Sequence, residues 1–239
     1  MRALHVHHDP NSLPGLVGAA LAAQGVEEVV HRVCVTPGSP VGDPVFPEPD
    51  AFDLVVLYGS RWSFDDPAVA HWVDPEQEFL RAADAAGVPV LGLCFGGQVL
   101  AAALGGSVGR AAHPEVGWCA VEPADPGTAA GRAALEAGVV AGPWLQWHGD
   151  AFTPPPGALE LARTGAGAQA FRLGGHLGLQ FHPEADREVL EAWLIDDDLD
   201  QLEAAGVDPD VFLADCDRHR AGAEARARAL VERVLSRVA

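Results

Sequence analysis

Residues 88–106 read VPVLGLCFGGQVLAAALGG, and this stretch is the most informative one for the fold. An apolar run leads into Cys94, glycines lie on both sides of the cysteine, and an alanine-rich run follows. The first run predicts a strand buried on both faces, and the second predicts a helix. A sharp turn between strand and helix therefore falls on Cys94, since Gly92 and Gly96 leave room for it.

Strands and helices alternate along the first hundred residues. The expected strands span residues 2–8, 27–35, 52–59 and 88–93, and the expected helices span residues 14–24 and 67–86. Alternation at this spacing is typical of βαβ units and predicts a parallel sheet.

The later half of the chain changes character. Four short strand-like segments, divided by Gly and Pro, predict a mixed or antiparallel arrangement: residues 117–123, 157–163, 168–174 and 176–182. From Asp186 onward the pattern is helical. With no internal repeat and no long linker, the 239 residues predict one α/β domain.

Composition narrows the possible functions. The formal net charge of −19 would repel nucleic-acid phosphates and anionic lipid, so neither is an expected partner. No apolar run reaches the roughly 18 residues of a membrane span, and no signal peptide is evident. The four cysteines are widely spaced, so neither a zinc site nor a disulfide framework is expected. A cytoplasmic location is the default expectation.

Two interpretations of Cys94 stay open on spacing alone. Gly-x-Cys-x-Gly has the form of a nucleophile elbow, in which a turn exposes the sulfur at the N-terminus of a helix that favours a thiolate. The Phe95 N–H, which follows the nucleophile, would face a developing oxyanion. The alternative is a tight strand-to-helix junction with a buried thiol, because glycine-rich turns also occur in nucleotide-binding folds.

A thiol nucleophile needs a base, and His182 is the best candidate among ten histidines. It ends an apolar strand, and Pro183 favours extended backbone, so Glu184 would face the same side and orient the imidazole. A surface His-Pro-Glu turn is the alternative. A metal site from His5, His7 and His8 is disfavoured, because strand alternation puts His8 on the opposite face.

Together the motifs carry a family resemblance. GLCFGGQ at 92–98, followed by GLQFHPE at 178–184, resembles the class I (triad-type) glutamine amidotransferases, and the likeness runs over most of the chain. The chain is most similar to stand-alone proteins related to the amidotransferase domain of GMP synthetase. Three further stretches carry the likeness: GLVGAALAAQG at 15–25, EVGW at 115–118 and WHGDAFTPPPGALELA at 147–162.

The resemblance implies a fold with definite parts. It implies a flavodoxin-like amidotransferase domain over residues 1–185, with a mostly parallel central sheet, helices on both faces and a smaller mixed or antiparallel sheet. A helical extension over residues 186–239 would pack on the same domain.

The resemblance also implies residue roles. Cys94 would attack the carboxamide of glutamine to give a γ-glutamyl thioester, His182 would transfer protons, and Glu184 would orient His182. Phe95 and Ser60 would supply the oxyanion N–H groups, although the family's Gly-Gly reads Gly59-Ser60 here, and a positive φ at Ser60 would be costly.

Further residues would contact the substrate. Gln98 would be a glutamine ligand, unless it is an exposed residue of the first helical turn. The backbone of Gly149 and Asp150 would meet the α-amino and α-carboxylate groups. Core or rim packing is expected of Trp62, Trp118, Trp144 and Trp147 more than substrate contact. No metal and no cofactor are expected, and the acidic residues 194–206 predict a solvated face or a partner surface.

Three functions are compatible with these residues. The first is a glutaminase that passes ammonia to a separate synthase subunit or an unidentified acceptor, the second a γ-glutamyl hydrolase acting on γ-glutamyl amines or peptides, and the third a non-catalytic regulatory subunit. The intact Cys94, His182 and Glu184 argue against the third. Under the first, we expect weak glutamine hydrolysis by the isolated chain and activation when a partner settles the Ser60 peptide.

Overall fold

The computed structural model of the chain describes residues 1–124, 139–195, 202–203 and 205–238. Its strands are β1 (Arg2–His7), β2 (Glu27–Arg32), β3 (Leu54–Leu57), β4 (Val90–Leu93), β5 (Ser107–Pro123), β6 (Gly142–Thr153), β7 (Leu159–Thr164), β8 (Gly167–Leu173) and β9 (His176–Leu179). Its helices are α1 (Gly15–Ala23), the short 3-10 helix η1 (Pro49–Ala51), α2 (Ala70–Ala85), α3 (Phe95–Ala103), α5 (Arg187–Trp193) and α7 (Pro209–Leu235).

All nine strands join one sheet in the order β2-β1-β3-β4-β9-β8-β7-β5-β6. The first five strands in this order are parallel, and the remaining pairs are antiparallel. The expected α/β fold with a mostly parallel centre is therefore confirmed. The expected smaller sheet is the long β5–β6 ribbon, which joins the main sheet where Glu122 and Pro123 pair with β7.

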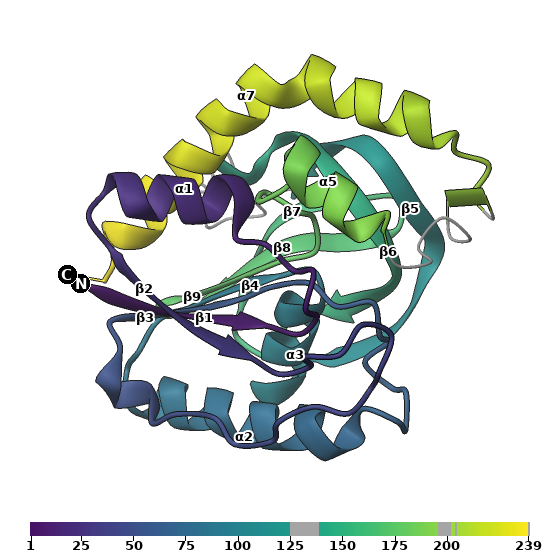
Figure 1. Cartoon of the computed structure of the whole chain (residues 1–239). Helices are drawn as coiled ribbons and strands as arrows, with labels where there is room; N and C mark the ends of the chain where they lie inside the picture. The colour runs from purple at the N-terminus through teal and green to yellow at the C-terminus, as the bar shows by residue number, and fades with distance from the viewer. Residues whose placement is uncertain (125–138, 196–201, 204, 239) are drawn as a thin grey trace.

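Helices cover both faces of the sheet (Figure 1). On one face α2 and α3 pack against the sheet around side chains such as Leu57 and Trp72, and on the other α1 and α7 pack around side chains such as Leu21 and Leu230. The central strands β3 and β4 read as apolar runs because both of their faces are covered.

The helical C-terminal part packs on the same sheet. Helix α7 lies alongside α1, and its Arg226 guanidinium sits over the Trp144 ring at 4.9 Å and donates to the Pro143 carbonyl. A boundary between residues 185 and 186 stays a prediction. Most of the acidic segment 194–206 lies outside the described residues.

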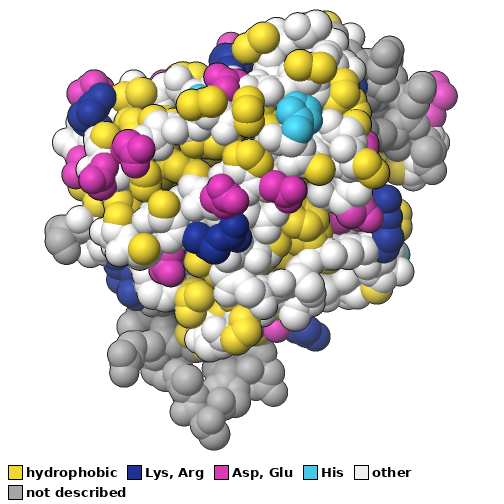
Figure 2. All heavy atoms as spheres, turned by 90° about the horizontal axis from the view of Figure 1, so that it is seen from below, with side chains coloured by type: hydrophobic (Ala, Val, Ile, Leu, Met, Phe, Trp, Pro, Cys, Tyr) yellow, Lys and Arg dark blue, Asp and Glu magenta, His cyan; other side chains and the backbone are white. Residues whose placement is uncertain are grey.

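The excess of acidic side chains does not gather on the face that Figure 2 shows. Acidic and basic side chains are interspersed there among apolar ones. Within the described part of the chain, no helix combines the length and apolarity that crossing a membrane requires.

Candidate active site

Cys94 lies on the sharp turn between β4 and α3, as expected. Its backbone has φ 50° and ψ −109°, and it is the one non-glycine residue with positive φ among the residues that the structure describes. A left-handed conformation is costly for a residue with a side chain and is typical of a nucleophile elbow. The sulfur accordingly lies in a pocket rather than in the core.

The glycines around Cys94 are required by close backbone packing. A Cβ on Gly92 would lie 2.6 Å from the Gly96 carbonyl oxygen, and a Cβ on Gly96 would lie 2.5 Å from the Leu57 side chain. A Cβ on Gly97 would lie 2.3 Å from the Leu179 carbonyl oxygen. The first turn of α3 can therefore approach β3 and β9 only because these positions carry no side chain.

His182 and Glu184 form a buried pair beside the elbow. His182 follows β9, and its Nδ1 lies 2.8 Å from Glu184 Oε1, with both side chains at most 5% exposed. The Glu184 carbonyl accepts a hydrogen bond from Leu16 N–H at the start of α1, which fixes this loop. Since Glu184 occupies Nδ1, Nε2 is the nitrogen left for the Cys94 thiol.

The environment of His182 favours its protonated form. Burial alone would lower the pKa of the imidazole, but the neighbouring Cys94 and Glu184 together raise it well above its usual value. Gly59 lies between the two side chains: a Cβ there would be 3.0 Å from His182 Cε1 and 3.9 Å from Cys94 Cβ. An imidazolium beside the sulfur stabilises a thiolate, the reactive form of cysteine.

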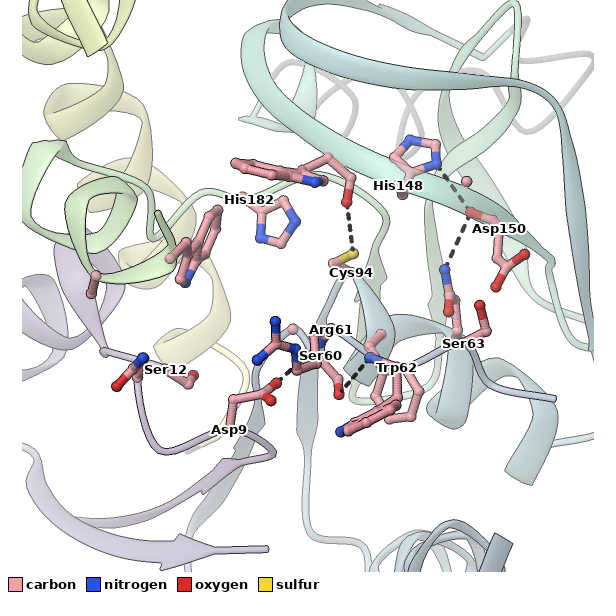
Figure 3. Close-up of a pocket in the computed structure, with 18 of the residues that line it drawn as sticks. Asp9, Ser12, Ser60, Arg61, Trp62, Ser63, Cys94, His148, Asp150 and His182 are labelled. Carbon is pink, nitrogen blue, oxygen red and sulfur yellow. Dashed lines mark hydrogen bonds between the residues drawn. The ribbon is translucent and has the colours of Figure 1, made fainter. Parts of the chain in front are cut away.

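Cys94 lines a cavity of about 330 Å³ that opens at the carboxyl end of the parallel strands (Figure 3). Its lining combines Gln98, His148, Gly149 and Asp150 with residues of the loops after β1 and β3. This is the edge of a parallel sheet where α/β proteins bind ligands.

The predicted substrate residues come together in this cavity. Gln98 is only 4% exposed, so its reading as an exposed helix residue is wrong. Its amide donates to the Asp150 carbonyl at 3.2 Å and to Gln180 Oε1 at 3.4 Å, while the Gln180 amide contacts Cys94 Sγ at 3.7 Å. The Asp150 carboxylate pairs with Arg110 at 2.8 Å.

His148 is a second imidazole in the cavity, and each of its nitrogens lies close to another polar group of the protein. Nδ1 is 3.0 Å from the Asp150 carbonyl oxygen, and Nε2 is 3.2 Å from Glu115 Oε2. His182 is therefore the better candidate for a base.

The predicted oxyanion residues line the same cavity as the cysteine. Phe95 is the first residue of α3, and Ser60 follows Gly59 in the loop after β3. Ser60 does not have a positive φ, so the strain considered for it does not arise. Its Oγ instead accepts a hydrogen bond from Trp62 N–H at 3.3 Å.

Several lining residues were missed from sequence, among them Asp9, Ser12, Arg61 and Trp193. Asp9 and Ser12 follow β1 at the same sheet edge, so their place after the HVHH strand was an available signal. Trp193 on α5 packs edge-on against His182 at 4.8 Å, and no motif marks it.

The tryptophans considered as pocket walls divide into two groups. Trp62 and Trp147 line the cavity. Trp144 is fully buried against Phe181, and Trp118 stacks on His219.

The N-terminal histidines lie on two faces of β1. His5 and His7 face Tyr58, and His8 faces Glu76 on α2. Within the described residues, His5, His7 and Glu28 are a group whose possible ligand atoms all lie within 4.8 Å. His5 Nδ1 is 2.9 Å from the Tyr58 hydroxyl and His7 Nδ1 is 2.8 Å from Ser12 Oγ, while the positive Arg32 beside His7 disfavours a cation.

The other cysteines lack an activating environment. Burial raises the pKa of Cys34 and of Cys216 to about 11 and also raises the pKa of Cys119. At neutral pH these thiols stay protonated, so they are poor nucleophiles.

Comparison with known proteins places this geometry in a family. The model of the glutamine amidotransferase class-I family matches residues 48–202. GMP synthase [glutamine-hydrolyzing] of Ralstonia pickettii is 32% identical over 212 residues, which cover 82% of this chain and 35% of that protein. The same-named protein of Aeropyrum pernix is 44% identical over 116 residues, covering 45% of this chain and 22% of that protein.

Solved structures agree over the full length of the fold. A glutamine amidotransferase from Thermotoga maritima superposes with a TM-score of 0.81 at 25% identity, covering 98% of this chain and 97% of that one. A glutamine amidotransferase from Methylobacillus flagellatus gives 0.82 at 26% identity, covering 98% and 94%.

The fold and the matched family model together define the class of protein to which this pocket and elbow belong. The chain belongs to the class I glutamine amidotransferase family. Its matched part covers only 35% of the length of the R. pickettii GMP synthase and 22% of the length of the A. pernix one.

Proposed function

We propose that this protein hydrolyses the side-chain amide of glutamine through Cys94, His182 and Glu184. The observation that carries the proposal is Cys94 on a strained elbow, lining a cavity beside the buried His182–Glu184 pair, in a chain of this family. Glu184 holds Nδ1 of the imidazole, so Nε2 takes the thiol proton.

The reaction proceeds in two balanced halves. The Cys94 sulfur adds to the amide carbon to give a tetrahedral oxyanion, and His182 delivers its proton to the leaving nitrogen, so that ammonia departs and a γ-glutamyl thioester remains. His182 then takes a proton from water, the hydroxide adds to the thioester carbon, and the sulfur leaves, which releases glutamate and restores the thiol.

The remaining predicted residues bind and polarise the substrate. The N–H groups of Phe95, at the start of α3, and of Ser60, in the loop after β3, would stabilise the oxyanion. Gln98 donates to the Asp150 carbonyl, and both residues line the cavity with Gly149, where they would hold the amino-acid end of glutamine.

Ammonia would pass to an acceptor held by a separate synthase subunit in the cytoplasm. The named relatives are longer glutamine-hydrolysing synthases, and this chain matches only part of them. Activation of glutamine hydrolysis when such a subunit is added supports this partner. Rapid hydrolysis by the purified chain, with no further increase, contradicts a need for it.

Hydrolysis of γ-glutamyl amines is a second candidate. Arg61 and Trp62 also line the cavity, which would leave room for a substituent on the amide nitrogen. Steady-state release of glutamate from glutamine and from γ-glutamyl amines, measured on the purified chain, decides between the two. Faster turnover of the substituted amides favours this candidate, and faster turnover of glutamine favours the first.

A further inference from the structure

The carbonyl of the Gly59–Ser60 peptide is held on the side away from the cavity. His8 Nδ1 lies 3.3 Å from the Gly59 carbonyl oxygen. In a trans peptide the C=O and N–H bonds point in opposite directions, so the Ser60 N–H leaves this peptide on the side opposite His8. Gly59 and Ser60 both line the cavity, and Gly59 faces His182 and Cys94 there.

His8 is fixed as a hydrogen-bond donor by its two partners. Its Nε2 lies 2.8 Å from Glu76 Oε1, and both side chains have no exposed surface. Burial disfavours charge on the imidazole, but Glu76, helped by Asp9 and the Gly59 carbonyl, raises the pKa of His8 above its usual value. With a carbonyl on one nitrogen and a carboxylate on the other, both nitrogens of the imidazolium donate.

The aromatic shell around His8 limits the freedom of its ring. The ring packs edge-on against Phe95 at 4.9 Å and stacks on Trp72 at 5.7 Å. Phe95 is also the residue that directly follows the nucleophile, so His8 contacts both segments whose N–H groups would bind the oxyanion, the start of α3 and the loop after β3.

Asp9, the residue after His8, contacts the chain on the other side of Ser60. Its Oδ2 accepts a hydrogen bond from Arg61 N–H at 3.0 Å (Figure 3). The Gly59 carbonyl and the Arg61 N–H, which flank Ser60, are therefore tied to two consecutive residues of the loop after β1.

We propose that His8 and Asp9 are positioning residues that clamp the Gly59–Ser60 peptide with its N–H directed at the oxyanion site. This inference rests on the proposed amide hydrolysis. A flipped peptide would take Ser60 toward positive φ, which a serine resists more than a glycine. The contacts of His8 and Asp9 and the preference of Ser60 for negative φ thus favour the same orientation of the Gly59–Ser60 peptide.

Two substitutions at His8 distinguish the hydrogen bond of Nδ1 to Gly59 from that of Nε2 to Glu76. In His8→Asn the amide nitrogen lies near the position of Nδ1 and can still donate to the Gly59 carbonyl. In His8→Gln the amide nitrogen lies near the position of Nε2, so it can donate to Glu76 but not to Gly59. The two variants therefore differ in the contact that the proposal uses.

We expect His8→Gln to lower kcat for glutamine by on the order of 10²-fold, as for loss of an oxyanion donor, with KM little changed. His8→Asn should lose clearly less. Alkylation of Cys94 by iodoacetamide, which forms no oxyanion, should proceed at the wild-type rate in both variants.

An unchanged kcat in His8→Gln overturns the proposal, as do equal losses in both variants accompanied by slowed alkylation. If His8→Gln does not fold, Asp9→Ala and Asp9→Asn test the same clamp, since only Asn retains an oxygen for Arg61 N–H; equal kcat in that pair overturns it. Glutamine hydrolysis that persists in Cys94→Ala would instead refute the proposed function itself.

Discussion

At the scale of single residues, Cys94 differs from the other cysteines in both backbone and surroundings. It has a positive φ and lines the cavity, whereas burial raises the pKa of Cys34 and Cys216 to about 11. The glutamine analogue 6-diazo-5-oxo-norleucine should therefore modify Cys94 alone, as read by mass spectrometry of peptides. Modification of Cys34, Cys119 or Cys216 with Cys94 intact would contradict this assignment.

Substitution of His182 should lower turnover more than substitution of Glu184. We expect His182→Ala to lower turnover by on the order of 10²–10⁴-fold, the usual cost of removing a general base. Glu184→Gln should lose less, because an amide oxygen can still accept the Nδ1 hydrogen bond of 2.8 Å. Glu188→Gln, on the exposed face of α5, is the matched control.

Steady-state ammonia release compares these three variants. A Glu184→Gln loss as large as that of Cys94→Ala would show that Glu184 does more than orient the base. An active His182→Ala would remove His182 from the mechanism.

At the scale of elements, the turn from β4 to α3 depends on backbone contact. A Cβ at Gly92 would lie within 2.8 Å of three backbone atoms of Gly96 and Gly97, so Gly92→Ala must push α3 away from β4. We expect a loss of about 1–3 kcal/mol in the free energy of unfolding, as for overpacking, together with loss of activity. Urea unfolding measures the loss in unfolding free energy.

Gly109→Ala is the control, since a Cβ at Gly109 meets nothing within 4 Å. If Gly92→Ala unfolds at the same urea concentration as Gly109→Ala, the glycine cluster does not have the steric role assigned to it.

Much at this scale could be predicted from sequence. The apolar run before Cys94 and the glycines after it indicated the strand, the turn and the helix, because each depends on local pattern and local sterics. The side chains that line the rest of the cavity could not be predicted this way. Arg61 and Trp193 reach the site through the order of strands and the packing of α5, and these contacts leave no local pattern.

At the scale of the whole molecule, buried histidines should make the fold sensitive to acid. Burial lowers the pKa of His5 to about 4 and of His7 to about 3, against an ordinary value of 6.5. Below pH 6.5 the unfolded chain therefore binds more protons than the folded chain. The free energy of unfolding decreases as the pH falls from about 6.5 toward the lowered pKa values of His5 and His7.

The His5 shift corresponds to on the order of 3 kcal/mol of unfolding free energy at pH 4. Urea unfolding between pH 7 and pH 4 should show this decline, and His5→Gln should flatten it, whereas the exposed control His113→Gln should not. Equal pH slopes for all three proteins would contradict the assignment.

Acid-quenched trapping of the γ-glutamyl enzyme, with glutamine labelled in its carbon chain, is the closest test of covalent catalysis by Cys94. A thioester forms even where turnover is slow, so the test does not depend on a partner subunit. We predict covalent label on the peptide that contains Cys94, labile to mild base, and none in Cys94→Ala. Label that persists in Cys94→Ala, or a wild-type protein that carries none, would contradict the proposed mechanism.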